Sequence, residues 1–335
     1  MQIMSILTVF FSFAITFLIT PIFIRFLRKA DIVGTDIHKA SKPLLPTSMG
    51  IPVAIGIFFS LMLFVFIRTF IYSDSADVVY IFATVTTILL ITFTGFLDDL
   101  LHHRTRDIHG DNRGPGGLKF WQRLLLVFPA AIPLMVISAG TTTMSFPFIG
   151  DVNFGLLYPL LLIPIGVVGA ANMVNLLGGL NGMEAGMGLV YTFMLGLYAY
   201  FVAGSSIATL IAFSTFGALL AVFYFNKYPA RILPGDSIQY LLGAVLVSIA
   251  VLGNMEKAVV VASLPFVIEF ALKLRGRLQN TTVGFLNKDG KVQSKYDKIY
   301  SIPHIFMKTG KFTEKQIVLF MILLELGFAS LIWVV

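Results

Sequence analysis

The sequence has 335 residues, of which 57% are hydrophobic and only 12% are charged, and its mean hydropathy is +0.89. A soluble domain carries about 25% charged residues, so this composition excludes an ordinary soluble enzyme, a disordered chain and a DNA-binding domain. The net charge of +7 must therefore be explained by where the basic residues lie relative to a membrane. The absence of cysteine excludes disulfides, thiol catalysis and cysteine-ligated metal sites.

Apolar segments long enough to cross a bilayer recur along the chain. A spanning α-helix needs about 20 mostly apolar residues, so we predict an all-α polytopic membrane protein with about ten transmembrane helices. We treat residues 1–335 as a single integral membrane domain. The first segment lacks the basic start and the cleavage site of a signal peptide, so we expect it to be retained. The predicted spans are 3–24, 49–72, 78–97, 120–140, 154–174, 185–203, 206–225, 237–254, 257–274 and 316–335.

The basic residues predict the orientation of these spans. Of the 24 lysines and arginines, 22 lie in or beside one set of alternate loops, and only Arg68 and Lys257 lie on the other side. The positive-inside rule places the first set in the cytoplasm and both termini outside. This distribution explains the net charge without a nucleic-acid partner. The predicted cytoplasmic loops are 25–48, 98–119, 175–184, 226–236 and the long loop 275–315.

The chemically active side chains collect on the same side, at the depth of the lipid headgroups. Asp98, Asp99 and Asp236 lie at predicted span ends, whereas the external loops carry few such groups. A transporter or channel, the alternative from another class, would place polar groups near the middle of the membrane. The observed pattern favours an enzyme whose substrate has one water-soluble and one lipid part.

The motif FLDDLL places Asp98 and Asp99 at the predicted C-terminal end of the third span. Their charges repel each other and the negative end of the helix dipole, so we expect a cation nearby. That cation is either Mg²⁺ or an arginine such as Arg104 or Arg106. The alternative interpretation is a pair of solvated acids that marks the end of a span. We interpret the histidine-rich stretch 102–111 as an exposed insertion.

The segment ANMVNLLGGLNGMEAG, residues 171–186, is the second candidate. Asn172 and Asn175 are one helical turn apart and share a face. Their amides offer neutral oxygen ligands and N–H donors, which suit a metal–phosphate or a nucleobase contact. The glycines Gly178, Gly179 and Gly182 allow close approach of the backbone to a ligand. The alternative is a glycine-rich turn between spans that an asparagine caps.

Asp236 follows Pro-Gly at the start of the eighth span, so we predict that it is the N-cap of that helix. The N–H groups of that helix end could also bind an anion. In the last loop, a lone histidine such as His304 is more often structural than catalytic. Glu269 is four residues before Lys273 and is expected to pair with it. Glu325 lies in the middle of the tenth span, so we expect it to be protonated or turned to a helix interface.

Together these motifs make the sequence similar to a known family. LDD, NMVNLLGGLNGMEAG and YPARILPGDS occur in the order found in polyprenyl-phosphate N-acetylhexosamine-1-phosphate transferases, ten-span enzymes with a cytoplasmic active site. The resemblance covers most of the chain, from residues 46–50 to the last span. GGLNGMEAG and FNKYPARILPGDS are more similar to the dolichyl-phosphate GlcNAc-1-phosphate transferases of eukaryotes and archaea than to the bacterial MurNAc-pentapeptide enzymes. Only His304 remains of the three-histidine motif of the bacterial branch.

The resemblance implies a role for each matched residue. The implied catalytic residues are Asp98, Asp99, Arg123 and Asp236. Asp98 and Asp99 would face the lipid phosphate, and Arg123 stands where the family usually has a phosphate-binding lysine. Asn175 and Asp236 would ligate Mg²⁺ or Mn²⁺ on the diphosphate, and Asn181 would contact uracil. The implied nucleotide-sugar contacts are Asn172, Asn181, Gly235, Arg275, Arg277 and His304.

The resemblance also implies a reaction. An oxygen of a polyprenyl or dolichyl phosphate attacks the β-phosphorus of UDP-GlcNAc and UMP leaves, which requires mainly positioning and charge neutralisation. The lipid-linked sugar would start glycan assembly of the protein N-glycosylation type. The alternative within the family is an undecaprenyl-phosphate sugar-1-phosphate transferase of cell-envelope polymer synthesis. We expect an integral protein of the prokaryotic plasma membrane or the eukaryotic ER membrane, surrounded by membrane lipid, and a homodimer stays open.

Overall fold

The computed structural model describes residues 2–74, 77–109, 120–146 and 150–334, and within these it describes side chains except at 2–3, 102–109, 120 and 145–146. Among the described residues, eight helices are long and apolar enough to cross a membrane. The all-α polytopic architecture is therefore confirmed. The long helical segments are α1 (Gln2–Lys29), α2 (Gly50–Phe70), α3 (Val78–His109), α6 (Ile163–Leu176), α7 (Met183–Tyr198), α8 (Ser206–Asn226), α9 (Gly235–Gly253) and α13 (Glu314–Ser330).

The two other predicted spans, 120–140 and 257–274, are broken into shorter helices. The first contains α4 (Phe120–Val127), a 3₁₀ turn (Phe128–Ala131) and α5 (Ile132–Val136), with Pro129 and Pro133 where the helix breaks. The second contains α10 (Glu256–Ala262) and α11 (Leu264–Arg275), separated at Ser263 before Pro265. Proline removes a backbone donor and crowds the preceding turn, so it interrupts both segments. The number of spans stays a prediction.

One predicted boundary is wrong in a way that matters for the site. We expected the third span to end at residue 97, but α3 continues to His109. Asp98 and Asp99 therefore lie inside a helix rather than at its C-terminal end. The continuation is polar, so hydropathy shows where the apolar part ends but not where the helix ends. The side chains of Arg104 and Arg106 and the rest of the 102–111 stretch lie outside the described residues.

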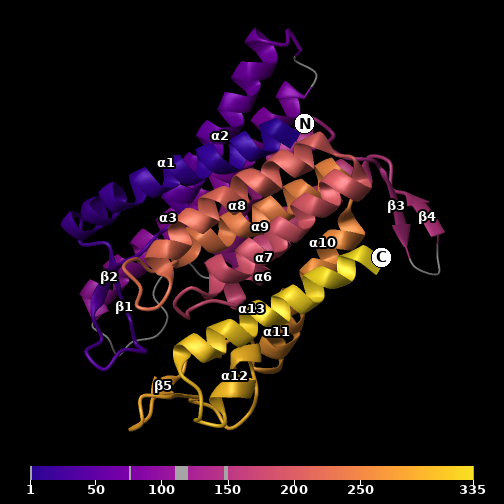
Figure 1. Ribbon diagram of the computed structural model, residues 1–335. Helices are drawn as coiled ribbons and strands as arrows, with labels where there is room; N and C mark the ends of the chain where they lie inside the picture. The colour runs from indigo at the N-terminus through magenta and orange to yellow at the C-terminus, as the bar shows by residue number, and fades with distance from the viewer. Residues whose placement is uncertain (1, 75–76, 110–119, 147–149, 335) are drawn as a thin grey trace.

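Short structures connect the helices. The described part of the chain contains three two-stranded antiparallel hairpins, which we did not predict: β1–β2 (Val33–Thr35, Leu44–Pro46), β3–β4 (Thr143–Phe146, Gly150–Asn153) and β5–β6 (Phe285–Leu286, Val292–Gln293). The short helix α12 (Ile302–Met307) follows the last hairpin. Two π-helical turns, Tyr158–Leu162 and Ala199–Ala203, extend α6 and α7, and a 3₁₀ turn (Leu331–Val334) extends α13. Figure 1 shows β1–β2, β5 and α12 at one end of the bundle and both termini with β3–β4 towards the other.

The centre of the bundle is α9. It is the most buried of the eight long helices, with 83% of its apolar window inside the protein, and it packs against α2, α3, α6 and α8. In contrast, α1 exposes apolar side chains such as Phe10, Leu18 and Ile22, as expected of a lipid-facing helix. The bundle therefore places one helix where several others can meet its N-terminal end.

Buried charges follow the expected pattern. The predicted pair of Glu269 and Lys273 is confirmed, with 3.6 Å between carboxylate and ammonium. The carboxylate of Glu269 also accepts the N–H of Ile302, and the ammonium of Lys273 donates to Thr282, so this pair anchors the 275–315 loop. Glu325 is fully buried in α13, which packs on α7, and its oxygens find no hydrogen-bond partner among the described residues.

We predict that the contact between α1 and α8 requires a glycine at position 217. A Cβ there would lie 2.3 Å from the carbonyl oxygen of Val9, whereas a Cβ at Gly327 meets nothing within 4 Å. Gly217→Ala should lower the free energy of unfolding by about 1–3 kcal/mol, because the helices must separate. The control Gly327→Ala should be neutral or stabilising, since alanine favours a helix by about 1 kcal/mol. Thermal unfolding in one detergent compares them, and equal stability of the two variants would contradict the prediction.

Candidate active site

Asp99 in α3 holds the first turn of α9. Its buried carboxylate accepts the N–H groups of Asp236 and Ser237 at 2.7 and 3.3 Å, and the hydroxyl of Ser48. The first N–H groups of a helix have no partner within the helix, and a carboxylate there is favoured by the helix dipole. Asp99 therefore supplies the cap of α9 from another helix. Our prediction that Asp236 is the N-cap is wrong, because Asp236 is the second helical residue and Pro234 occupies the cap position.

Gly235 makes this contact possible. Its φ is +71°, and a Cβ on it would lie 2.6 Å from a carboxylate oxygen of Asp99 and 2.8 Å from the backbone nitrogen of Ser48. Both the backbone conformation and the available space therefore demand glycine. Gly235 thus lets the backbone of α9 approach the carboxylate of Asp99. The sequence analysis gave Gly235 only the role of a nucleotide-sugar contact, which stays a prediction.

The two predicted metal ligands lie next to each other. The Asn175 amide donates to a carboxylate oxygen of Asp236 at 2.7 Å, across the packed helices α6 and α9. Carboxylate and amide oxygens are hard ligands that suit Mg²⁺, which commonly takes one or two protein ligands and completes its shell with water and substrate phosphate. Among the described residues, no group of three or more acids and histidines could hold a metal. The pair therefore fits a metal that is shared with a diphosphate.

Asp98 pairs with Arg123, while its expected pairing with Arg104 or Arg106 concerns side chains outside the described residues. Its carboxylate lies 2.9 Å from Nε of Arg123 and accepts the hydroxyl of Tyr240 at 3.1 Å. Asp98 is fully buried, whereas the Arg123 side chain is 22% exposed. The charges of Asp98, Asp99 and Arg123 all act on Asp236. The structure therefore gathers the four implied catalytic residues around the N-terminal end of α9.

A polar cavity of about 240 Å³ opens beside these residues. Its lining includes Gly235 and Asp236 from α9, and Asn181 from the glycine-rich turn. Asp36 and His38 from the β1–β2 connection also line it. The cavity thus has Asp236 of the candidate metal pair on one part of its wall, and on another part side chains that can form hydrogen bonds with a ligand.

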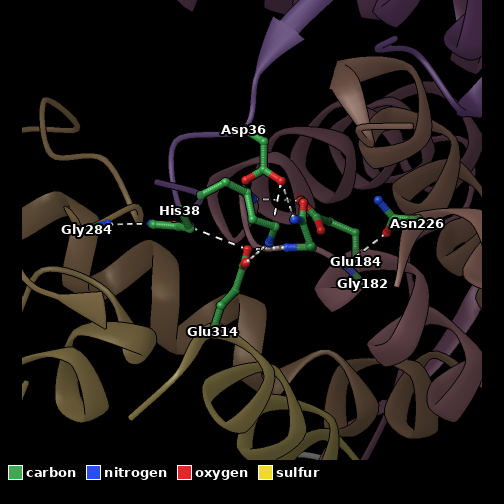
Figure 2. Close-up of polar contacts among 10 residues, drawn as sticks. Asp36, His38, Gly182, Glu184, Asn226, Gly284 and Glu314 are labelled. Carbon is green, nitrogen blue, oxygen red and sulfur yellow. Dashed lines mark hydrogen bonds and ion pairs between the residues drawn. The ribbon is translucent and has the colours of Figure 1, made fainter. Parts of the chain in front are cut away.

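The glycine-rich turn is held by Glu184 in α7. One carboxylate oxygen of Glu184 accepts the N–H of Gly179 at 2.8 Å and the side-chain amide of Gln239 at 3.2 Å. A Cβ on Gly178 would lie only 2.0 Å from that amide nitrogen. The close approach that we predicted for these glycines is present, but the neighbour is a protein side chain. Gly182 donates its N–H to Asn226, as Figure 2 shows.

Asn181 is buried and bound at two points. Its backbone N–H donates to Glu314 at 2.9 Å, and its side-chain Nδ2 donates to Asp36 at 2.8 Å. We did not single out Asp36, Lys39, Glu184, Gln239 or Glu314 from the sequence. The sequence could have indicated Glu184 through its place within the motif NGMEAG. It could have indicated Asp36 and Lys39 through TDIHK, a polar stretch between two short apolar runs.

The remaining predicted residues lie elsewhere or face other groups. The Asn172 amide donates to the carbonyl of Val168 in its own helix at 2.8 Å. Arg275 and Arg277 are exposed at and just beyond the end of α11. Their roles stay predictions.

His304 is buried in α12 and engaged at both ring nitrogens. One nitrogen contacts the carbonyl of Thr281 at 3.1 Å, and the other accepts the N–H of Tyr300 at 3.3 Å. Burial, together with the Lys273 ammonium, lowers the pKa of His304 to about 4. The ring is therefore neutral at pH 7 and fastens α12 to the segment before β5. Its implied contact with the nucleotide sugar stays a prediction.

Known proteins resemble this chain over nearly its whole length. The sequence model of glycosyl transferase family 4 matches residues 81–254. A relative from Saccharolobus solfataricus, provisionally named a UDP-N-acetylglucosamine–dolichyl-phosphate N-acetylglucosaminephosphotransferase, is 34% identical over 98% of this chain and 96% of its own. A relative of that name from Dictyostelium discoideum is 24% identical over 94% and 85% of the two chains. A phospho-N-acetylmuramoyl-pentapeptide-transferase from Clostridioides difficile is 30% identical over 90% and 89%.

We predict that Gly235→Ala damages the site more than its backbone conformation alone explains. Gly290, in the β5–β6 turn, has a similar φ of +69°, but a Cβ there meets nothing within 4 Å. Both variants carry the cost of a left-handed alanine, about 1–2 kcal/mol. Only Gly235→Ala displaces Asp99, so it should lose more stability and most activity. Thermal unfolding and turnover measure the two effects, and matching losses in both variants would show that Asp99 tolerates the displacement.

Proposed function

Because the chain belongs to glycosyl transferase family 4, we propose that it transfers GlcNAc-1-phosphate from UDP-GlcNAc to a dolichyl-type polyprenyl phosphate and releases UMP. The observation that carries this proposal is the cluster of Asp98, Asp236 and Asn175 beside one polar cavity. The relatives named for this reaction match nearly the whole chain. The active site faces the cytoplasm in this proposal, because the basic loops lie at the same end of the bundle.

Asp236 and Asn175 would hold Mg²⁺ or Mn²⁺ against the diphosphate of UDP-GlcNAc. The metal, when bound, neutralises charge on the diphosphate and so favours attack at the β-phosphorus. Asn175 orients the Asp236 carboxylate through the 2.7 Å hydrogen bond between them. Asp99 acts through α9, because its own oxygens are engaged by Ser48 and by the N–H groups of Asp236 and Ser237. Asp99 is thus a positioning residue.

Arg123 supplies positive charge for the phosphates. Asp98 binds its Nε, which leaves the other N–H groups of the guanidinium for a phosphate in a forked arrangement. The reaction joins an oxygen of the lipid phosphate to the β-phosphorus and breaks the bond from that phosphorus to the bridging oxygen, which departs with UMP. Asp98 keeps the guanidinium in place, and Tyr240 keeps Asp98 in place.

The lipid chain would lie in an apolar cavity of about 540 Å³ along α6, α9, α10 and α11. Its wall includes Gly166, Gly169 and Met173 of α6, and Phe266 of α11. The wall of α6 ends at Val174, directly before Asn175, so a prenyl chain in this cavity brings its phosphate towards the metal pair. The two glycines leave room for the chain, because they present no side chain to the cavity.

We predict that turnover requires a divalent cation. Purified protein with UDP-GlcNAc, Mg²⁺ and dolichyl phosphate should release UMP, and excess EDTA should abolish the release until Mg²⁺ or Mn²⁺ is restored. Asp236→Ala should lose most activity, while the control Asp297→Ala, in an exposed loop, should keep it. Undecaprenyl phosphate in a parallel assay tests the bacterial-type alternative. Full turnover in EDTA would refute the metal site, and no UMP release with either lipid would refute the function.

We predict that Arg123→Lys keeps partial activity and that Arg123→Ala keeps little. Lysine retains a point charge without the forked geometry, and alanine retains neither. The fall in kcat/KM for alanine should be at least tenfold, which corresponds to about 1.4 kcal/mol of transition-state stabilisation. The control Arg28→Ala removes an exposed arginine from the end of α1. If Arg123→Ala matches wild type and this control, Arg123 serves only as a membrane anchor.

A further inference from the structure

Ser48 has a backbone conformation that its residue type does not favour. Its φ is +90°, the largest among the described residues other than glycine, and a positive φ crowds the Cβ of an L-residue. The other non-glycine residues with a positive φ are exposed or half-buried, whereas Ser48 is fully buried. Glycine would adopt this conformation without the crowding. The side chain of Ser48 must therefore make a contact that glycine cannot make.

We propose that Ser48 is a positioning residue for the transfer reaction. Its hydroxyl fixes the carboxylate of Asp99, which in turn fixes the first turn of α9 and the side chain of Asp236. Loss of the hydroxyl should therefore slow turnover, while the binding of UDP-GlcNAc stays nearly unchanged. The inference rests on the proposed function, and it gives the segment before α2 a part in the reaction.

The Ser48 hydroxyl completes the hydrogen bonding of Asp99. Oδ1 of Asp99 accepts the N–H of Asp236 at 2.7 Å, and Oδ2 accepts the N–H of Ser237 at 3.3 Å. The hydroxyl of Ser48 also donates to Oδ2. The two N–H groups belong to α9, whereas Ser48 lies just before α2, so its hydrogen bond holds the carboxylate from a second direction. Without this bond, Oδ2 would keep only its contacts with Ser237, and the carboxylate would be freer to turn away from the end of α9.

The same hydroxyl connects the start of α9 to the start of α2. The hydroxyl oxygens of Ser48 and Ser237 lie 3.1 Å apart, and that of Ser237 accepts the N–H of Gly50, the first residue of α2, at 3.1 Å. The first N–H groups of a helix need partners from outside the helix. One buried network therefore holds the first turns of α2 and α9 together with Asp99 of α3. A buried network in which these groups satisfy one another leaves each of them little freedom.

The backbone on both sides of Ser48 keeps it in its unfavourable conformation. The N–H of Leu233 donates to the carbonyl of Pro46 at 2.7 Å, and the N–H of Met49 donates to the carbonyl of Pro234 at 2.9 Å. These two hydrogen bonds pair the segment before α2 with the segment before α9. Strained residues persist where their surroundings over-determine them, and they concentrate at functional sites. Ser48 meets both conditions, because it lies against the helix end that forms the candidate site.

The test compares Ser48→Ala and Ser48→Gly by thermal unfolding and by the kinetics of UMP release. Both variants lose the hydroxyl, so kcat should fall at least tenfold in each, which corresponds to about 1.4 kcal/mol. The KM for UDP-GlcNAc should change by less than about threefold. Ser48→Gly also relieves the backbone, so it should unfold at a higher temperature than Ser48→Ala. If the serine served folding alone, activity would return together with stability in Ser48→Gly.

The control Ser138→Gly makes the same change at an exposed residue with a φ of +48°, and it should keep both kcat and KM. Ser237→Ala is a second variant, which removes the hydroxyl between Ser48 and Gly50 but keeps the backbone N–H groups that Asp99 accepts. Its kcat should fall by at least about threefold at an unchanged KM, so it decides the question if neither Ser48 variant folds.

A wild-type kcat in Ser48→Gly overturns the proposal, and so does a loss that lies in KM instead of kcat. A wild-type kcat in Ser237→Ala overturns it where that variant decides. A failure of the proposed function is seen separately, as wild-type protein that releases no UMP from UDP-GlcNAc.

Discussion

The structure depends on one buried carboxylate that is stabilised by the N-terminus of a neighbouring helix. Asp99 lies where the apolar part of α3 ends, and an unpaired charge there would be costly to bury. The N–H groups of Asp236 and Ser237 need partners for the same reason, since they begin a helix. The hydrogen bonds from these N–H groups to the Asp99 carboxylate satisfy the donors and the acceptor at once. The contact fixes where α9 begins relative to α3, and so fixes the position of the Asp236 side chain.

The first turns of α9 organise the rest of the site. Side chains at successive positions of this helix reach different neighbours, because a helix turns its side chains through about 100° per residue. The contacts are Asp236 with Asn175 of α6, Gln239 with Glu184 of α7, and Tyr240 with Asp98 of α3. A shift of α9 by one residue would break all of them together. The site is therefore positioned by one central helix rather than by its loops.

The sequence predicts the apolar helices and the residues of the site better than the contacts between them. Apolar length identifies the spans, and the shared side of Asp98 and Asp236 indicates that they meet. The capping role of Asp99 is hidden, because its partner is 137 residues away. The hydrogen bonds of Asn181 with Asp36 and Glu314 join residues that are 145 and 133 positions apart in the sequence. Local sequence patterns carry no information on such long-range contacts. The C-terminal end of α3 was missed because it is polar and has no periodic apolar residues that would predict a helix.

The place of Asp98 and Asp99 in α3 has a consequence for the energetics of a lipid substrate. The apolar part of α3 continues to Leu101, just beyond the two acids, while the helix itself extends to His109. We therefore predict that the acids lie level with the boundary between hydrocarbon and headgroups. Moving a prenyl chain into water would cost about 0.8 kcal/mol for each CH₂ group. A reaction centre at this level lets the phosphate react while the chain stays in the bilayer, so no extraction step opposes turnover.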